Sequence, residues 1–190
     1  MGRISTNHKQ LGALLSSVTE EAHKLFDNIQ DESFYKRPGQ DKWCAGECLD
    51  HLNITAGLYL NEIERSINKE NNPPKTAEDY KPRFILDKFI KMTGPNSKTK
   101  LKSPGVLVRK NLHEFKLPKR IVIDQFFDIQ KRLQGFLKQS ENISLSKAMI
   151  SWPVLKFIKL QLGEAFLLNG VHALRHLQQA ERAINSLSNK

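Results

Sequence analysis

Two histidines, His172 and His176, lie four residues apart within the longest helical pattern of the chain. Positions i and i+4 of a helix lie one above the other on the same face. Two imidazoles placed in this way can hold one metal ion, as His-x-x-x-His helices do in zinc metalloproteases. The pair alone is a weak signal, since helices also bury histidines for packing, so a metal site requires a further ligand.

A third candidate ligand, His51, lies at the edge of the apolar face of another helical segment. Three neutral imidazoles would leave one coordination position open for water, hydroxide or a thiolate, as in reactive metal sites. Zinc would lower the pKa of a bound water to about 7. The three residues predict a divalent metal, with zinc as the first expectation and nickel or iron as alternatives. The other interpretation, hydrogen-bonded core histidines, stays open.

Several other side chains are candidates around this set. Ligating histidines usually donate their second N–H group to a carboxylate or carbonyl oxygen, and Glu47, Asn169 and Gln179 lie three or four residues from a candidate ligand. Of the remaining histidines, only His113 is expected to be able to reach the site. No serine nucleophile arrangement, phosphate loop or paired-carboxylate site stands out, so the sequence predicts no catalytic residue.

The two cysteines, Cys44 and Cys48, are four residues apart just before His51. In a reducing compartment they are expected to stay as thiols and to pack as small buried side chains. A metal cluster built from Cys44, Cys48 and His51 is the alternative. It is disfavoured because the chain has no further cysteine to complete an iron–sulfur site.

Four long segments carry apolar residues at spacings of three and four, which predicts amphipathic helices. They cover residues 11–29, 43–68, 118–137 and 151–187. Ser151 is the expected N-cap of the last helix, with Pro153 in its first turn. A long basic connection, about 69–118, contains one short helical candidate at 84–92 and acts as a binding loop, a crossover, or both. The pattern predicts one all-α domain, 1–190, a four-helix bundle with a long crossover between helices two and three.

The net charge of +10 is concentrated in the middle of the chain, where ten basic residues lie between Lys88 and Arg120. This region shows none of the motifs of nucleic-acid-binding folds, so nucleic acid is not the expected partner. No apolar stretch approaches the roughly 20 residues of a membrane span, and the N-terminus does not resemble a secretory signal. A cytoplasmic protein without a membrane partner is therefore expected.

The run Trp43-Cys44-Ala45-Gly46-Glu47-Cys48-Leu49-Asp50-His51-Leu52, followed by His172-x-x-x-His176-x-x-Gln179, resembles the DinB-like superfamily. That group includes YfiT-like metal-dependent hydrolases and bacterial thiol-dependent transferases. The resemblance covers nearly the whole chain and implies an up-down-down-up bundle, a divalent metal on His51, His172 and His176, and a homodimer. One departure is Arg175, which stands where many relatives carry another histidine.

The expected function is a metal-dependent enzyme acting on a small molecule. The resemblance implies either a hydrolase or a low-molecular-weight-thiol-dependent transferase, in which the metal activates water or a thiol. A non-catalytic metal- or ligand-binding stress-response protein is the alternative, and nucleic-acid association through the basic connection is a third hypothesis. Fold analogy alone does not supply the reaction.

Overall fold

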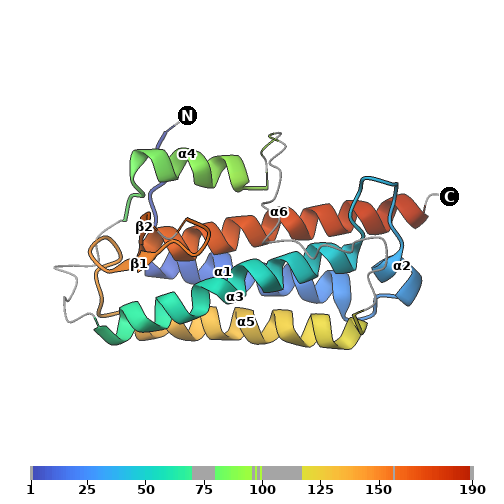
Figure 1. The fold of residues 1–190 in the computed structure, drawn as a ribbon, viewed down its shortest axis with the longest axis horizontal. Coiled ribbons are helices and arrows are strands. Elements are labelled where there is room, and N and C mark those ends of the chain that lie inside the picture. The colour runs from blue at the N-terminus through green and yellow to red at the C-terminus, as the bar shows by residue number, and fades with distance from the viewer. Residues whose placement is uncertain are drawn as a thin grey trace.

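Four long helices lie side by side in the computed structural model, which describes residues 2–69, 80–95, 97, 99, 117–155 and 157–188 (Figure 1). They are α1 (His8–Phe26), α3 (Ala45–Lys69), α5 (Lys119–Gln139) and α6 (Leu162–Ser188). Two shorter helices accompany them, α2 (Asp31–Tyr35) and α4 (Phe84–Thr93). Most described residues are helical, which confirms the expected all-α character of the chain. None of the helices in these ranges is both long and apolar enough to cross a bilayer.

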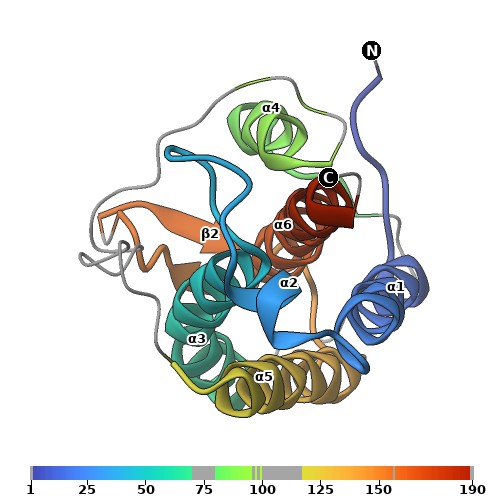
Figure 2. The ribbon, with the colours of Figure 1, turned by 90° about the vertical axis from the view of Figure 1, so that its right-hand side faces the viewer.

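Each long helix contacts two others, since α1 and α3 both pack against α5 and α6. In Figure 1, α1 and α6 run from left to right, whereas α3 and α5 run from right to left. Figure 2 looks along the helices and shows α4 outside the four, beside α6. Apolar residues at helical spacing fill the centre; on α1 these are Leu11, Leu15, Val18, Ala22 and Phe26.

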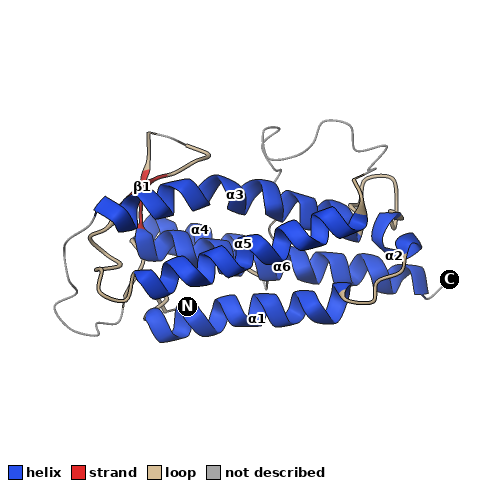
Figure 3. Cartoon of the chain, turned by 90° about the horizontal axis from the view of Figure 1, so that it is seen from below, coloured by secondary structure: helices blue, strands red, loops and turns tan. Residues whose placement is uncertain are grey.

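The segment before α6 differs from the prediction that a helix starts at Ser151. Residues Met149–Ser151 (β1) and Lys159–Gln161 (β2) instead pair as an antiparallel hairpin, shown in red in Figure 3. Ile150 and Leu160 face each other in this hairpin and are both buried. Pro153 disfavours helical backbone at Trp152, whose indole Nε1 donates to the Tyr59 hydroxyl at 2.7 Å. The helix therefore begins only at Leu162.

The short helical candidate at 84–92 is confirmed, since α4 covers Phe84–Thr93. The N-terminal segment holds α4 in place, because the backbone N–H of Ile4 donates to the Asp87 carboxylate at 2.8 Å. His113 and most of the basic connection lie outside the described residues. Their expected role stays a prediction.

The two helices that carry the candidate ligands, α3 and α6, begin in the same way. In α3, Glu47 Oε2 accepts the backbone N–H of Cys44 at 2.9 Å. In α6, Glu164 Oε2 accepts the backbone N–H of Gln161 at 2.8 Å. Each glutamate reaches back three residues to satisfy a donor at the helix start, as in one half of a capping box. Their negative charge also suits the positive end of the helix dipole.

Each capping glutamate is also paired with an arginine from an earlier part of the chain. Arg37 binds both carboxylate oxygens of Glu47, and Arg83 binds both carboxylate oxygens of Glu164. The glutamate side chains are 1% and 0% exposed, respectively. A buried carboxylate is costly unless it is paired and hydrogen-bonded. These contacts therefore fix where α3 and α6 begin, and they hold the segments that carry Arg37 and Arg83 against the two helix starts.

Close packing of α1 against α6 depends on Gly170. A Cβ atom at this position would lie 2.6 Å from Cδ2 of Leu14. The absence of a side chain lets the α6 backbone approach α1 just ahead of His172. The helix that carries two candidate ligands is therefore held closely against α1.

Replacing Arg83 with methionine should lower the free energy of unfolding by about 2 to 3 kcal/mol, because Glu164 is left buried without its partner. Urea unfolding of the purified variant measures the change. The matched control is Arg65→Met, which removes the exposed Arg65 from its pair with the partly buried Glu62 and should cost no more than about 1 kcal/mol. Equal losses in both variants would contradict this account of the α6 start.

Candidate metal centre

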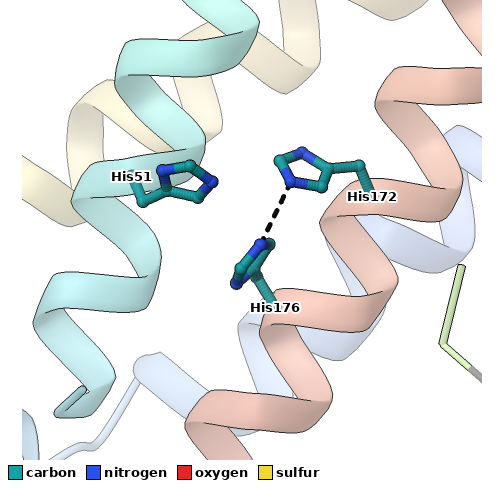
Figure 4. A group of neighbouring side chains, drawn as sticks. All are labelled: His51, His172 and His176. Carbon is teal, nitrogen blue, oxygen red and sulfur yellow. Dashed lines mark hydrogen bonds between the residues drawn. The ribbon is translucent and has the colours of Figure 1, made fainter. Parts of the chain in front are cut away.

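Three histidine rings meet between α3 and α6 (Figure 4). His51 comes from α3, and His172 and His176 come from successive turns of α6. One ring nitrogen from each lies within 4.8 Å of the others. His51 and His176 are 4% and 8% exposed, whereas His172 is largely buried but keeps an exposed part. The structure thus brings the three candidate ligands together, with His172 nearest to solvent.

The spacing of the α6 nitrogens suits a shared ligand. Nε2 of His172 and Nε2 of His176 are 3.1 Å apart. Two nitrogens bound to one tetrahedral ion at about 2.0 to 2.1 Å would be separated by roughly 3.3 Å. Without an ion, one nitrogen must carry a proton and donate it to the other. With both deprotonated, the two lone pairs are available to the same cation.

Burial keeps the α6 imidazoles in the neutral form that binds metal. Burial, followed by the nearby His51 and Arg175, lowers the pKa of His172 to about 3. Burial, followed by His172, also lowers the pKa of His176 well below its ordinary value. Neutral imidazoles do not need to lose a proton before they bind a cation at neutral pH. The donor set therefore fits a divalent metal.

Of the three side chains expected to orient the rings, Gln179 lies close to His176 and opposes the lowering of its pKa. Nδ1 of His176 has no hydrogen-bond partner in the described part of the chain. Asn169 instead donates to the Ala165 carbonyl of its own helix at 2.8 Å.

Glu47 has a different role from the expected one. Its carboxylate accepts from Arg37 and from the backbone N–H of Cys44. In the first turn of a helix, backbone N–H groups lack partners within the helix and compete for any nearby acceptor. Glu47 therefore acts on His51 through the position of α3, one turn earlier in the helix.

The cysteines take no part in the cluster. Cys44 and Cys48 are free and buried, as expected. Burial raises the pKa of the Cys44 thiol to about 12 and raises that of Cys48 well above its ordinary value. Metal ligation requires the thiolate. Within the described ranges, the ligand group around His51 contains histidines alone, so the cysteine-based alternative has no support.

Trp43 is a site residue to which the sequence assigned no role. Its ring centre lies 5.1 Å from that of His51 and 5.8 Å from that of His176, nearly parallel to the latter. The residue is half-buried just before α3, so it covers part of the cluster and excludes water from that side. The available signal was an aromatic residue eight positions before His51. An aromatic residue near a helix start is common and does not by itself indicate a metal site.

The metal-free protein should lose stability as the pH falls from 7 to 5. The unfolded chain binds protons on His172 near its ordinary pKa of 6.5, whereas the folded protein does so only near pH 3. Folding thus opposes protonation throughout this range. One such histidine lowers the free energy of unfolding by up to about 2 kcal/mol between pH 7 and pH 5. Urea unfolding of His172→Gln should show a smaller loss over these two pH units. Equal losses in the variant and the parent would contradict the predicted burial effect.

Comparison with known proteins places this site in a family context. The family model of the DinB superfamily matches residues 14–180. No curated protein and no solved structure matched the chain. The matched range includes His51, His172 and His176 and most of the four long helices. The chain therefore belongs to the DinB superfamily.

Proposed function

We propose that the protein is a metal-dependent enzyme whose divalent ion is held by His51, His172 and His176. The observation that carries this proposal is the convergence of three imidazole nitrogens within 4.8 Å. An all-imidazole set suits zinc, nickel or iron better than magnesium or calcium, which prefer oxygen ligands. Zinc is the first choice among them.

The chemistry of such a centre would be the activation of a weak nucleophile. When bound with one position open, the ion supplies Lewis acidity that lowers the pKa of a water or a thiol. His51 and His176 form the buried part of the cluster, and the lower exposure there limits competing water. His172 is the most exposed of the three ligands, and we infer that a small molecule enters from its side. We infer either hydrolysis or transfer of a low-molecular-weight thiol as the reaction.

Several further properties belong to the same proposal. We infer a single domain with an up-down-down-up bundle, which the helix directions in Figure 1 support. We also infer a bacterial, cytoplasmic homodimer that acts without a membrane or nucleic-acid partner. The alternative function is a non-catalytic metal- or ligand-binding stress-response protein. It shares the three-histidine centre and differs only in lacking turnover.

Protein purified without a histidine tag should contain about one divalent ion per chain by elemental analysis. Replacing His51, His172 or His176 with alanine should lower metal affinity by at least about 100-fold, since even the loss of an outer partner costs 10- to 100-fold. The control His23→Ala removes an exposed histidine that contacts Asp27 and Phe127 and should retain the metal. Metal-free protein that does not take up added zinc would refute the proposal.

A screen of small thiols with electrophilic co-substrates, and of hydrolysable esters and amides, should separate the two functions. An enzyme should give saturable turnover that is lost in His176→Ala. Metal-free protein should show no turnover. Metal binding of the expected stoichiometry, with no turnover of any of these compounds, would favour the non-catalytic alternative.

A further inference from the structure

Arg175 carries a positive charge at the edge of the candidate metal centre. It lies on α6 one residue before His176 and three residues after His172. Three helical residues turn by about 300° and rise by about 4.5 Å. Arg175 therefore lies about 60° around α6 from His172, on the side of that ligand where α4 packs. Its charge contributes to the lowered pKa of both histidines.

The guanidinium of Arg175 is held in place by backbone carbonyls. Nη1 donates to the carbonyls of Met92 at 3.0 Å and Gly94 at 3.4 Å. Nη2 donates to the carbonyl of Thr99 at 2.5 Å. These acceptors lie at and beyond the C-terminal end of α4, where the helix dipole favours a cation. The contacts orient the guanidinium before any ligand arrives.

These contacts leave part of the guanidinium unused. Arginine has five N–H donors, and the three carbonyls are bound through Nη1 and Nη2 alone. In the described part of the chain, the Nε proton and the second Nη2 proton have no acceptor. The Nε–Nη2 edge is one of the two edges with which arginine binds a carboxylate through two hydrogen bonds.

The charge of Arg175 also lacks a carboxylate partner among the described residues. The buried glutamates at the starts of the two ligand-bearing helices are already paired, Glu47 with Arg37 and Glu164 with Arg83. A cation next to the three histidines makes the local potential positive, and a divalent ion in the centre would increase it. Such a place attracts an anion.

We propose that Arg175 binds an anionic oxygen group of the small-molecule ligand, a carboxylate in the simplest case, while the reacting atom of that ligand faces the three histidines. The inference rests on the proposed function, because that function places the reacting atom of the ligand at the three histidines. It narrows the substrate class to anionic molecules. The competing role for Arg175 is purely structural, as a tie between α6 and the end of α4.

The test compares probes with and without a carboxylate. Cobalt-loaded protein is titrated with mercaptoacetate and with 2-mercaptoethanol, and the dissociation constants are read from the thiolate-to-cobalt absorption. Metal-free protein is titrated with acetate and followed by NMR. The variants are Arg175→Gln and the charge-preserving Arg175→Lys, each checked for folding by circular dichroism. Arg182→Gln is the matched control, because it removes an exposed charge from the same helix two turns further on.

The parent protein and Arg182→Gln should bind mercaptoacetate about tenfold more tightly than 2-mercaptoethanol, and Arg175→Gln should reduce this ratio to below about twofold. Arg175→Lys should keep part of the preference, and binding of 2-mercaptoethanol should not change. The same preference in the parent and in Arg175→Gln would overturn the inference. If the protein takes up no cobalt, the proposed function fails and the acetate titration decides: Arg175-dependent binding supports the anion site, and its absence overturns it.

Discussion

The candidate site depends on the relative rotation and register of α3 and α6. One residue of slip in either helix turns its side chains by about 100° and shifts them by 1.5 Å. Such a slip would point His51 away from His172 and His176. The structure limits it by burying Glu47 and Glu164 at the two helix starts, where each accepts a backbone N–H and an arginine. An ion pair of this kind has one geometry, because any displacement leaves a buried charge without its partner.

Burial has opposite consequences for the polar groups near the site. At the helix starts the carboxylates stay charged, because each faces an arginine. Between the helices, burial favours the neutral form of the His172 and His176 imidazoles. Burial therefore strengthens the ion pairs at the helix starts and keeps the His172 and His176 imidazoles in the form that binds metal. Trp43 adds to this effect by stacking near His176.

Much of the fold and the pairing of His172 with His176 could be predicted from the sequence, because both follow from local periodicity. The apolar spacing identified the four long helices, and the i, i+4 spacing identified the pair that shares a face of α6. The start of α6 could not be predicted in this way. Trp152 and Pro153 resemble the first turn of a helix, but the contact between Trp152 and Tyr59 joins residues far apart in the sequence. The prediction that Glu47 orients the His51 ring was wrong for a related reason. Its partner, Arg37, comes from the segment before α3, and the sequence does not reveal this contact.

The central claim is that three histidines, without the cysteines, bind one ion. X-ray absorption spectroscopy of zinc-loaded protein tests it most directly, because it identifies the atoms around the metal. The account predicts imidazole nitrogens at about 2.0 to 2.1 Å and no sulfur contribution from Cys44 or Cys48. A shell of protein sulfur at about 2.3 Å, or a metal surrounded by oxygen alone, would contradict it.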